Sequence, residues 1–365
     1  MATEKASFQG YSERSEESLS VCVRRERGIP RHAACLGITN GEFFRDLLSL
    51  WGFESDYLRF DLQKKIKPHR LRSVLPKKRI TMPATAILLV SCPDQKGLVA
   101  HISEFLFQNN GNIIHADNHI DAETGLFLMR VEWELEGFRI PRAEIAARFA
   151  PLAERLKMRW RIHFSDAPQR IAIMVSKYGH CLYDLLLRSV SEELPGKISL
   201  VISNHADLQA VPERFGIPFH VFPIHPENKR EQEQNELRLL EENQIDLVVL
   251  ARYMQVLGPE FAEKYSHRII NIHHSFLPAF VGARPYHQAY DRGVKLIGAT
   301  SHYVTEQLDD GPIIEQDIVR ISHRDSVEDL VRKGRDLERV VLARAVHLHL
   351  GFRVLPYGRK TAIFD

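Results

Sequence analysis

Hydrophobic periodicity divides the chain into three regions. Residues 1–81 are polar and charged, and only the segment 43–51 places apolar residues at helical spacing. From residue 83 onward, short apolar runs alternate with amphipathic stretches of helical period. We therefore predict a poorly patterned, disordered extension over 1–81, a small domain over 83–166 and a larger domain over 169–365.

The small domain has the pattern of four strands and two helices. Apolar or alternating runs predict strands at 85–92, 112–120, 126–135 and 158–164, and helical spacing predicts helices at 97–109 and 141–156. Asn110-Gly111 signals the end of the first helix, and a tight turn at Asp121–Gly125 joins the middle strands. The resulting order, βαββαβ, is that of a ferredoxin-like sandwich.

The larger domain alternates strands with helices. Strands are predicted at 170–175, 198–203, 219–222, 246–251, 269–273, 296–303 and 313–321, and helices at 180–190, 206–215, 230–242, 259–265 and 326–348. Short apolar strands separated by helices predict a Rossmann-like α/β fold, with a mostly parallel sheet covered on both faces. Ligands of such sheets bind beyond the carboxyl ends of the strands.

Composition narrows the class of protein. The net charge of +2 argues against a dedicated nucleic-acid binder, and no apolar run is long enough for a transmembrane helix or a signal peptide. The four cysteines, Cys22, Cys35, Cys92 and Cys181, form no CxxC pair and no zinc-binding spacing. Reduced thiols in the cytoplasm are the simplest interpretation.

The positive charge is concentrated in the N-terminal region. Residues 1–81 hold 16 Lys and Arg against 10 Asp and Glu. A basic arm for anionic surfaces is therefore an alternative to simple disorder. Because patterned sequence begins at Met82, a true start of translation there is a third alternative.

A candidate site lies at the end of the 269–273 strand. Side chains alternate faces along a strand, so Asn271 and His273 share one face while Ile272 and His274 point away. Some thirty residues later, an Asp-Asp-Gly-Pro turn can hang the carboxylate of Asp309 over the neighbouring strand end.

An amide, an imidazole and a carboxylate together suit acyl transfer. Asn can donate to a developing oxyanion, His can donate or shuttle a proton, and Asp can hold the imidazolium or orient water. No GxSxG nucleophile motif is present, so direct attack by an external nucleophile fits better than a covalent intermediate. Pattern alone leaves open that the strand-end His and the turn Asp are structural.

The segment 271–314 resembles the formyltransferase fold of enzymes that use 10-formyltetrahydrofolate. That family carries an N-I-H-x-S-x-L-P strand end and an Asp two residues before a Gly, and the resemblance extends over 169–355. It implies Asn271, His273 and Asp309 as catalytic residues, no metal and no cofactor, with the folate as substrate. It also implies folate contacts from Arg252, Tyr253, Met254, Val256, Leu257, Thr305, Glu306 and Leu308. An ordinary core is the alternative for the apolar members of that set.

The small domain resembles an ACT domain. A strand, the sequence CPDQKG and a helix occur in this order within a βαββαβ unit. The resemblance implies pairing with a second copy, hence a homo-oligomer, and binding of an amino-acid effector near Asp94, Gln95, Lys96 and Gly97. A helix N-terminus there could receive a carboxylate. Alternatively, Pro93-Asp94 only caps the helix, and the domain only dimerises.

The loop after the first strand of the larger domain bears on the acceptor. Glycinamide ribonucleotide formyltransferases have a Gly-rich phosphate loop there, whereas residues 176–182 keep one Gly and place Lys177, His180 and Cys181 on the acceptor side. About ten residues follow Leu355, too few for the tRNA-binding domain of other formyltransferases.

An ACT-like domain before such a loop resembles the deformylases of 10-formyltetrahydrofolate. The resemblance implies hydrolysis to formate and tetrahydrofolate, which supplies formate for purine synthesis and balances folate pools. Asn271 and protonated His273 would polarise the formyl oxygen, while Asp309 positions His273 and orients water or relays its proton. Two alternatives stay open: formyl transfer to glycinamide ribonucleotide, and a non-catalytic sensor of amino acids and folate.

Overall fold

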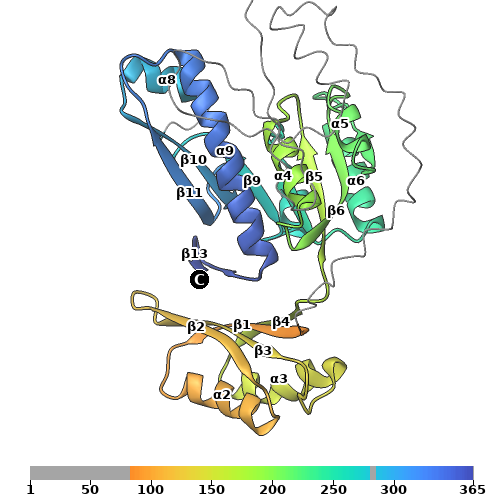
Figure 1. The fold of residues 1–365 in the computed structure, drawn as a ribbon, viewed down its shortest axis with the longest axis vertical. Helices are drawn as coiled ribbons and strands as arrows, with labels where there is room; N and C mark the ends of the chain where they lie inside the picture. Colours follow the sequence, from red (N-terminus) through yellow and green to blue (C-terminus); the bar gives the residue numbers. More distant parts are fainter. Residues whose placement is uncertain (1–82, 280–284, 365) are drawn as a thin grey trace, which may run out of the picture. The chain divides into compact units, whose positions relative to one another are not determined.

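The computed structural model describes residues 83–279 and 285–364 (Figure 1), and Thr81–Asp365 form one compact unit. The predicted extension over 1–81, its basic arm, the start at Met82 and the thiols Cys22 and Cys35 lie outside the described residues. Within the described residues, no helix combines the length and apolar character needed to cross a membrane.

The small sheet confirms the ferredoxin-like prediction. Its elements are β1 (Thr85–Pro93), α2 (Leu98–Gln108), β2 (Ile113–Asp121), β3 (Leu126–Glu134), α3 (Ile145–Arg155) and β4 (Arg159–Phe164). The strands form an antiparallel sheet in the order β2-β3-β1-β4. The second helix starts later than predicted, because a 3-10 turn at Arg142–Glu144 precedes it.

One face of the small sheet packs on its two helices. Leu88 and Val90 of β1 and Trp133 of β3 are buried there against Ile102 of α2 and Phe149 of α3. These strand positions alternate with residues on the opposite face, as expected for period-two strands. Because β1 and β3 are buried at nearly every position, the opposite face of the sheet must be covered as well.

The opposite face contacts a C-terminal hairpin that the sequence pattern did not predict. This hairpin consists of β12 (Val354–Tyr357) and β13 (Lys360–Ile363). Leu89 and Leu128 cluster with Ala362 and Phe364 at the contact. The buried Arg130 donates from Nε to the carbonyl oxygen of Phe352 at 3.1 Å. The small sheet is therefore joined to the end of the chain by apolar packing and a buried guanidinium.

The second sheet has seven strands in the order β11-β10-β9-β8-β5-β6-β7. Its elements are β5 (Gln169–Val175), α4 (His180–Val190), β6 (Gly196–Ser203), α5 (Ala210–Glu213), β7 (Phe219–Val221), α6 (Lys229–Glu242), β8 (Leu247–Leu250), α7 (Pro259–Lys264), β9 (Ile269–His273), α8 (Pro285–Arg292), β10 (Leu296–Tyr303), β11 (Ile313–Arg320) and α9 (Val327–Leu350). Strands β5 to β9 pair in parallel, whereas β10 runs antiparallel to both of its neighbours, β9 and β11. The mostly parallel sheet is confirmed, but α5 is shorter than predicted and α8 was not predicted.

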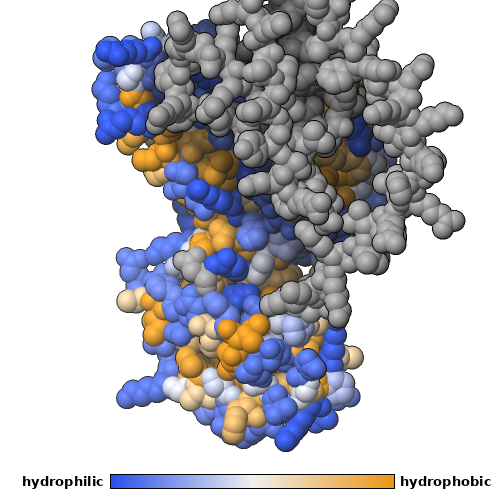
Figure 2. Space-filling view, in the orientation of Figure 1, coloured by the Kyte–Doolittle hydropathy of each residue, from blue (hydrophilic) through white to orange (hydrophobic). Residues whose placement is uncertain are grey.

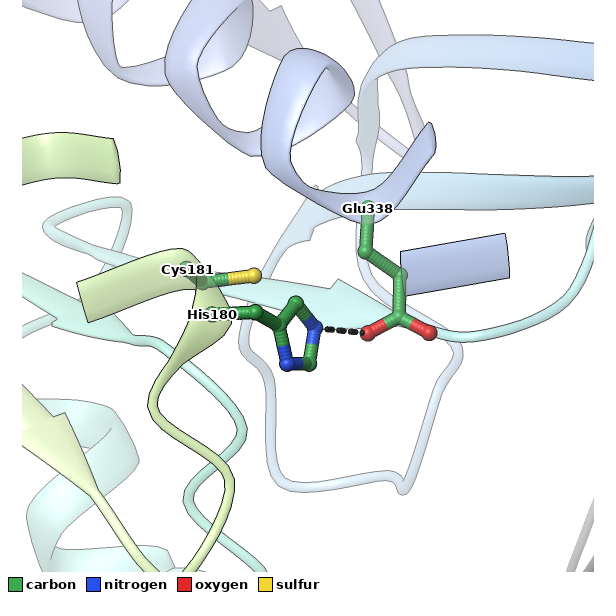
Figure 3. Close-up of side chains that lie close together, drawn as sticks. All are labelled: His180, Cys181 and Glu338. Atoms are coloured by element: carbon green, nitrogen blue, oxygen red, sulfur yellow. Dashed lines mark hydrogen bonds and ion pairs between the residues drawn. The ribbon is translucent and has the colours of Figure 1, made fainter. Parts of the chain in front are cut away.

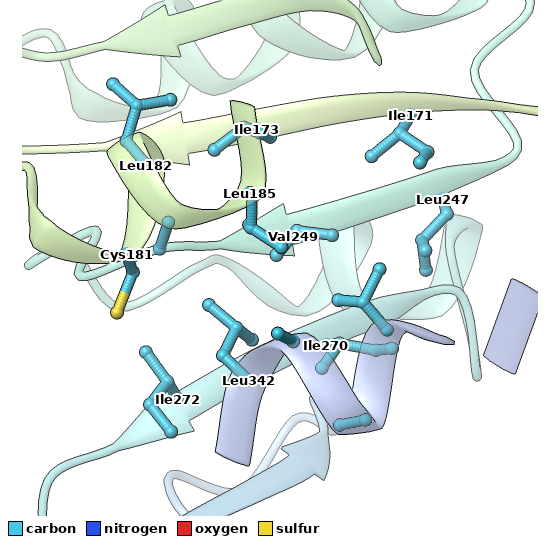
Figure 4. Packing of buried hydrophobic residues seen from close by; sticks show 14 of the residues in the cluster. Ile171, Ile173, Cys181, Leu182, Leu185, Leu247, Val249, Ile270, Ile272 and Leu342 are labelled. Atoms are coloured by element: carbon cyan, nitrogen blue, oxygen red, sulfur yellow. The ribbon is translucent and has the colours of Figure 1, made fainter. Parts of the chain in front are cut away.

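Helices cover both faces of this sheet. Figure 4 shows Ile173, Val249 and Ile270 of one face packed against Leu185 of α4 and Leu342 of α9. Residues of α6 and α7 cover the other face. Strand β8 joins β5 on the side opposite to β6, so a crevice opens between the loops after β5 and β8. The fold thus places a ligand site at the predicted sheet edge.

Candidate active site

A cavity of about 550 Å³ lies at the carboxyl ends of β8 and β9, a volume typical of small-molecule sites. It is lined by four groups of residues. They are Tyr178 and His180; Leu250 and Arg252 to Leu257; Asn271 to His274; and Pro285 to His287, His302, Val304 to Asp309, Val331, Arg335 and Glu338.

The three predicted catalytic residues meet in this cavity. Nδ1 of His273 lies 3.2 Å from Oδ2 of Asp309, and Asn271 precedes His273 on the same strand. Asp309 has a φ of 55°, and its loop folds back on β10. A Cβ at Gly311 would overlap with the carbonyl oxygen of Tyr303, so this close return requires glycine. The Asp-x-Gly spacing therefore has a physical cause.

A fourth residue, His302, was missed. Antiparallel pairing of β10 with β9 sets His302 opposite Asn271, and Nε2 of His302 lies 3.3 Å from Nδ2 of Asn271. Nδ1 of His302 contacts the carbonyl oxygen of Tyr303 at 2.8 Å, and a carbonyl can only accept, so Nδ1 donates. In the neutral ring Nε2 accepts from Asn271. This bond fixes the amide and leaves its second N–H for a substrate oxygen.

The charge of Asp309 determines which atom of His273 donates to it and which remains for a substrate. Burial alone would raise the pKa of Asp309, but the hydrogen bond from His273 and the nearby imidazole of His302 hold it well below its usual range. The carboxylate is therefore ionised and can only accept, so Nδ1 of His273 donates to it. Nε2 of His273 is buried and has no partner among the described residues. That atom is the one a substrate oxygen would meet.

His274 corrects the prediction from alternation. Ile272 packs in the core and only borders the cavity, but His274 lies at the cavity with its ring 5.3 Å from that of His273. The strand ends at His273, so the two-residue alternation stops there. Burial, together with the nearby charge of Arg252, lowers the pKa of His274 to about 4. Its imidazole is neutral at physiological pH.

All eight residues predicted to contact folate line the cavity. The alternative of an ordinary core is wrong for Met254 and Val256, whose residues are each 53% exposed. Leu308 is similarly exposed at 64%. An open apolar wall of this kind suits a flat aromatic ring.

The predicted acceptor-side residues are not all at the cavity. His180 lines it, together with Tyr178, but Lys177 and Cys181 are not among the lining residues. Cys181 is fully buried in the hydrophobic core, and burial raises the pKa of its thiol well above the usual range. The expectation that Cys181 lies on the acceptor side of the cavity is therefore wrong. The pattern missed Glu338, which reaches the cavity from α9.

The predicted effector loop is exposed. Asp94, Gln95, Lys96 and Gly97 all lie at the surface before α2. Gly97 is the N-cap residue, with a φ of 90°, and no side chain caps the helix. The alternative that Pro93-Asp94 serves as the helix cap is therefore wrong, while effector binding stays a prediction.

The fold and the Asn–His–Asp site define an α/β enzyme of the formyl-transferring class, and the sequence pattern of the formyl transferase family matches residues 169–346. A formyltetrahydrofolate deformylase from Synechocystis sp. is 61% identical over 280 residues, which are 77% of this chain and 98% of that protein. The chain belongs to the formyltetrahydrofolate deformylase family.

Comparison with solved structures also finds deformylases of this family. The crystal structure of a formyltetrahydrofolate deformylase from Pseudomonas syringae pv. tomato has a TM-score of 0.77 and 49% identity, covering 79% of this chain and 96% of its own. A glycinamide ribonucleotide transformylase from Symbiobacterium toebii has a TM-score of 0.51 and 33% identity, covering 54% of this chain and 95% of its own. Both solved structures are covered almost completely, but the deformylase matches 79% of this chain and the transformylase only 54%.

Proposed function

We propose that this protein hydrolyses 10-formyltetrahydrofolate to formate and tetrahydrofolate. The observation that carries the proposal is the buried, unpartnered Nε2 of His273 beside Asn271, with Nδ1 held by Asp309. Both groups can donate to one oxygen atom in the cavity. The names of the relatives support the same substrate.

The chemistry follows from these positions. The folate ring lies against the wall that contains Met254 and Val256, and the formyl oxygen accepts bonds from Asn271 and protonated His273. Asp309 stabilises the imidazolium, so negative charge can develop on the oxygen as water adds to the carbon. The carbon–nitrogen bond then breaks, and His273 protonates the amine of tetrahydrofolate. The folate is a substrate, and one proton of the attacking water must still pass to an acceptor.

Water fits the acceptor side better than an amine nucleotide. A phosphate loop needs several glycines whose backbone N–H groups can approach the anion closely. The loop over 176–182 keeps only Gly179, which has a helical φ of −89° open to any residue. Tyr178 and His180 instead project side chains to the cavity.

Turnover without an amine acceptor tests the proposal. Purified protein should release formate and tetrahydrofolate in equal amounts from 10-formyltetrahydrofolate. Asn271→Ala should lose about two to three decades of kcat, as loss of an oxyanion donor does. Absence of formate release by the folded wild-type protein would leave the non-catalytic sensor as the better account.

We also propose that the small sheet and its helices form an ACT-type regulatory domain that pairs with a second copy and binds an amino acid near Asp94–Gly97. The βαββαβ order and the exposed loop before α2 support this. Phe107, Ile114 and Ile120 of this domain are large apolar residues that are exposed, and Figure 2 shows apolar areas on the surface of the small sheet and its helices. Calorimetry with the twenty amino acids tests the site, and light scattering tests the pairing. No binding at millimolar concentration would reduce the domain to a dimerising module.

We further propose that the reaction occurs in the cytoplasm and supplies formate for purine synthesis. Cys92 and Cys181 are both free and buried, as is common for thiols in a reducing compartment. Cells that carry an inactive Asp309 variant should then need added formate or purine under conditions that limit other formate sources. Normal growth without either supplement would refute this role.

A further inference from the structure

A second carboxylate–imidazole pair borders the same cavity. Glu338 of α9 is only 1% exposed, and its Oε2 lies 2.7 Å from Nε2 of His180 (Figure 3). Its Oε1 accepts a bond from the hydroxyl of Tyr286 at 2.6 Å, and Nε of Arg252 lies 3.5 Å from Oε2. Both oxygens of this buried carboxylate are therefore engaged.

Helix α9 is adapted to this arrangement. Gly334 lies one turn before Glu338, in the interior of a helix where glycine costs roughly 1 kcal/mol relative to alanine. A Cβ there would overlap with the hydroxyl and ring of Tyr286. The glycine therefore makes room for the side chain that bonds Glu338, which indicates a built contact rather than a chance approach.

The cluster is a hydrogen-bonded one rather than a metal centre. His180, Cys181 and Glu338 offer ligand atoms within 4.8 Å of one another, a spacing at which a metal could bind. Arg252 already provides a cation to the carboxylate, and the Cys181 thiol has a raised pKa that keeps it protonated. A metal ion would have to displace both features.

Hydrolysis needs an acceptor for a proton of water, and the groups around His273 are poor acceptors. Asp309 has both oxygens near imidazoles, and the bond from His273 together with the proximity of His302 holds its pKa well below the usual range. His274 is neutral, but burial lowers its pKa to about 4, so it too is a weak base. Glu338 is closed in by its three partners.

His180 lines the same cavity, and its bond to Glu338 leaves it a nitrogen that can accept a proton. Burial alone would raise the pKa of Glu338, but the bond from His180 and the charge of Arg252 lower it, so the carboxylate is ionised and can only accept. Nε2 of His180 therefore donates, which fixes the tautomer with a lone pair on Nδ1. Figure 3 shows this second nitrogen turned away from Glu338.

We propose that His180, held by Glu338 and Tyr286, is the base that takes a proton from the attacking water. The inference rests on the hydrolysis proposed above and assigns its missing base. The water oxygen bonds to the formyl carbon as one of its protons passes to Nδ1 of His180. The carbon–nitrogen bond breaks, its electron pair takes the proton of His273, and solvent then returns the His180 proton to His273.

Chemical rescue tests the base directly. His180→Ala should lower kcat by about 10²–10⁴-fold, as loss of a general base does, with KM for the folate within about threefold of wild type. Added imidazole should restore at least about a tenth of the lost rate, and substituted imidazoles should restore more as their basicity rises. His220→Ala, on the edge strand β7 and outside the cavity lining, controls for nonspecific effects of imidazole.

Glu338→Gln provides a second test, because glutamine keeps the volume of the side chain and leaves no cavity in the core. It should lower kcat about tenfold or more without raising KM, whereas Glu132→Gln, in another Arg–Glu pair whose arginine is buried, should leave kcat unchanged. Rates are measured as tetrahydrofolate formed, with and without glycinamide ribonucleotide, so the test holds whichever acceptor is used. An active wild type whose His180→Ala variant keeps its rate, or loses it without any rescue, overturns this proposal alone. An inactive wild type overturns the proposed function and this proposal with it.

Discussion

At the scale of single residues, the site is defined by the bonds around Asp309. Its carboxylate accepts from His273, while His302 orients Asn271 from the facing strand. Asp309→Asn keeps the volume but removes the charge that holds the imidazolium. We expect a normally folded protein with kcat lower by at least about two decades.

The neighbouring Asp310 supplies a matched control. It pairs with Arg359 and is not among the cavity-lining residues, so Asp310→Asn should keep nearly full activity. Formate release by the two variants, measured beside their circular dichroism, checks this contrast. A residual rate above about a tenth of wild type in Asp309→Asn would remove Asp309 from the centre of the mechanism.

The residues at the site also show what sequence reasoning can reach. Strand alternation and a turn signal, both local rules, marked Asn271, His273 and Asp309 as candidates, and the resemblance to the formyltransferase fold selected them as catalytic. His302 depends on the register between two antiparallel strands, which no local pattern fixes. Glu338 lies on the buried stripe of α9 with Leu330 and Val341, and a charge in such a stripe was the signal that could have found it.

At the scale of elements, α9 links packing to the site. Its capping box at Ser326 and Asp329 starts the helix, and its buried stripe carries Gly334 and Glu338. Gly334→Ala should stabilise an isolated helix by roughly 1 kcal/mol, but here the new Cβ must displace Tyr286. We therefore expect a lower Tm and a lower kcat than wild type. A higher Tm with unchanged kcat would show that Tyr286 moves freely and that its bond to Glu338 is dispensable.

Elements differ in how well their sequence predicts them. The long periodic helices and the buried strands were placed within a few residues, because their apolar faces are continuous. Helix α8 is polar over most of its length and was missed. The hairpin of β12 and β13 was missed because four-residue strands, one containing Pro356, give little periodicity. Its contacts with Leu89 and Leu128 are long-range and are absent from any local pattern.

At the scale of the whole molecule, buried histidines link stability to pH. Burial lowers the pKa values of His163, His274 and His349 from 6.5 to about 4. The unfolded chain takes up protons near pH 6.5 while the folded chain does so only near pH 4, so acid favours unfolding. We expect the free energy of unfolding to fall as pH drops from 6.5 to 4, by up to about 1.4 kcal/mol per pH unit for each histidine.

A single substitution tests this linkage. His163 stacks on Phe352 with ring centroids 3.9 Å apart, so His163→Phe keeps the stacking and removes one titrating group. Urea unfolding at several pH values should show a shallower loss of stability on the acid side for the variant. Equal slopes for variant and wild type would mean that His163 protonates without cost in the folded protein.

From the extent of the compact unit we expect that residues 1–81 are not needed for activity. Thr81–Asp365 form that unit, and the Synechocystis relative matches over 280 residues that are 98% of its own length. A chain that starts at Met82 should therefore fold and release formate at the rate of the full-length protein. Aggregation or inactivity of the shorter chain, beside an active full-length protein, would show that residues 1–81 are required.

The choice between water and an amine is the central claim, and one competition measurement tests it most directly. Hydrolysis and formyl transfer share Asn271, His273 and Asp309, so specificity must arise on the acceptor side, where Tyr178, His180 and Glu338 line the cavity. A transferase gains several kcal/mol by aligning its acceptor. The protein is supplied with 10-formyltetrahydrofolate and glycinamide ribonucleotide together, and formate and formylated ribonucleotide are quantified. We predict that formate dominates and that its rate is unchanged by the ribonucleotide. Products dominated by formylated ribonucleotide would contradict the deformylase mechanism.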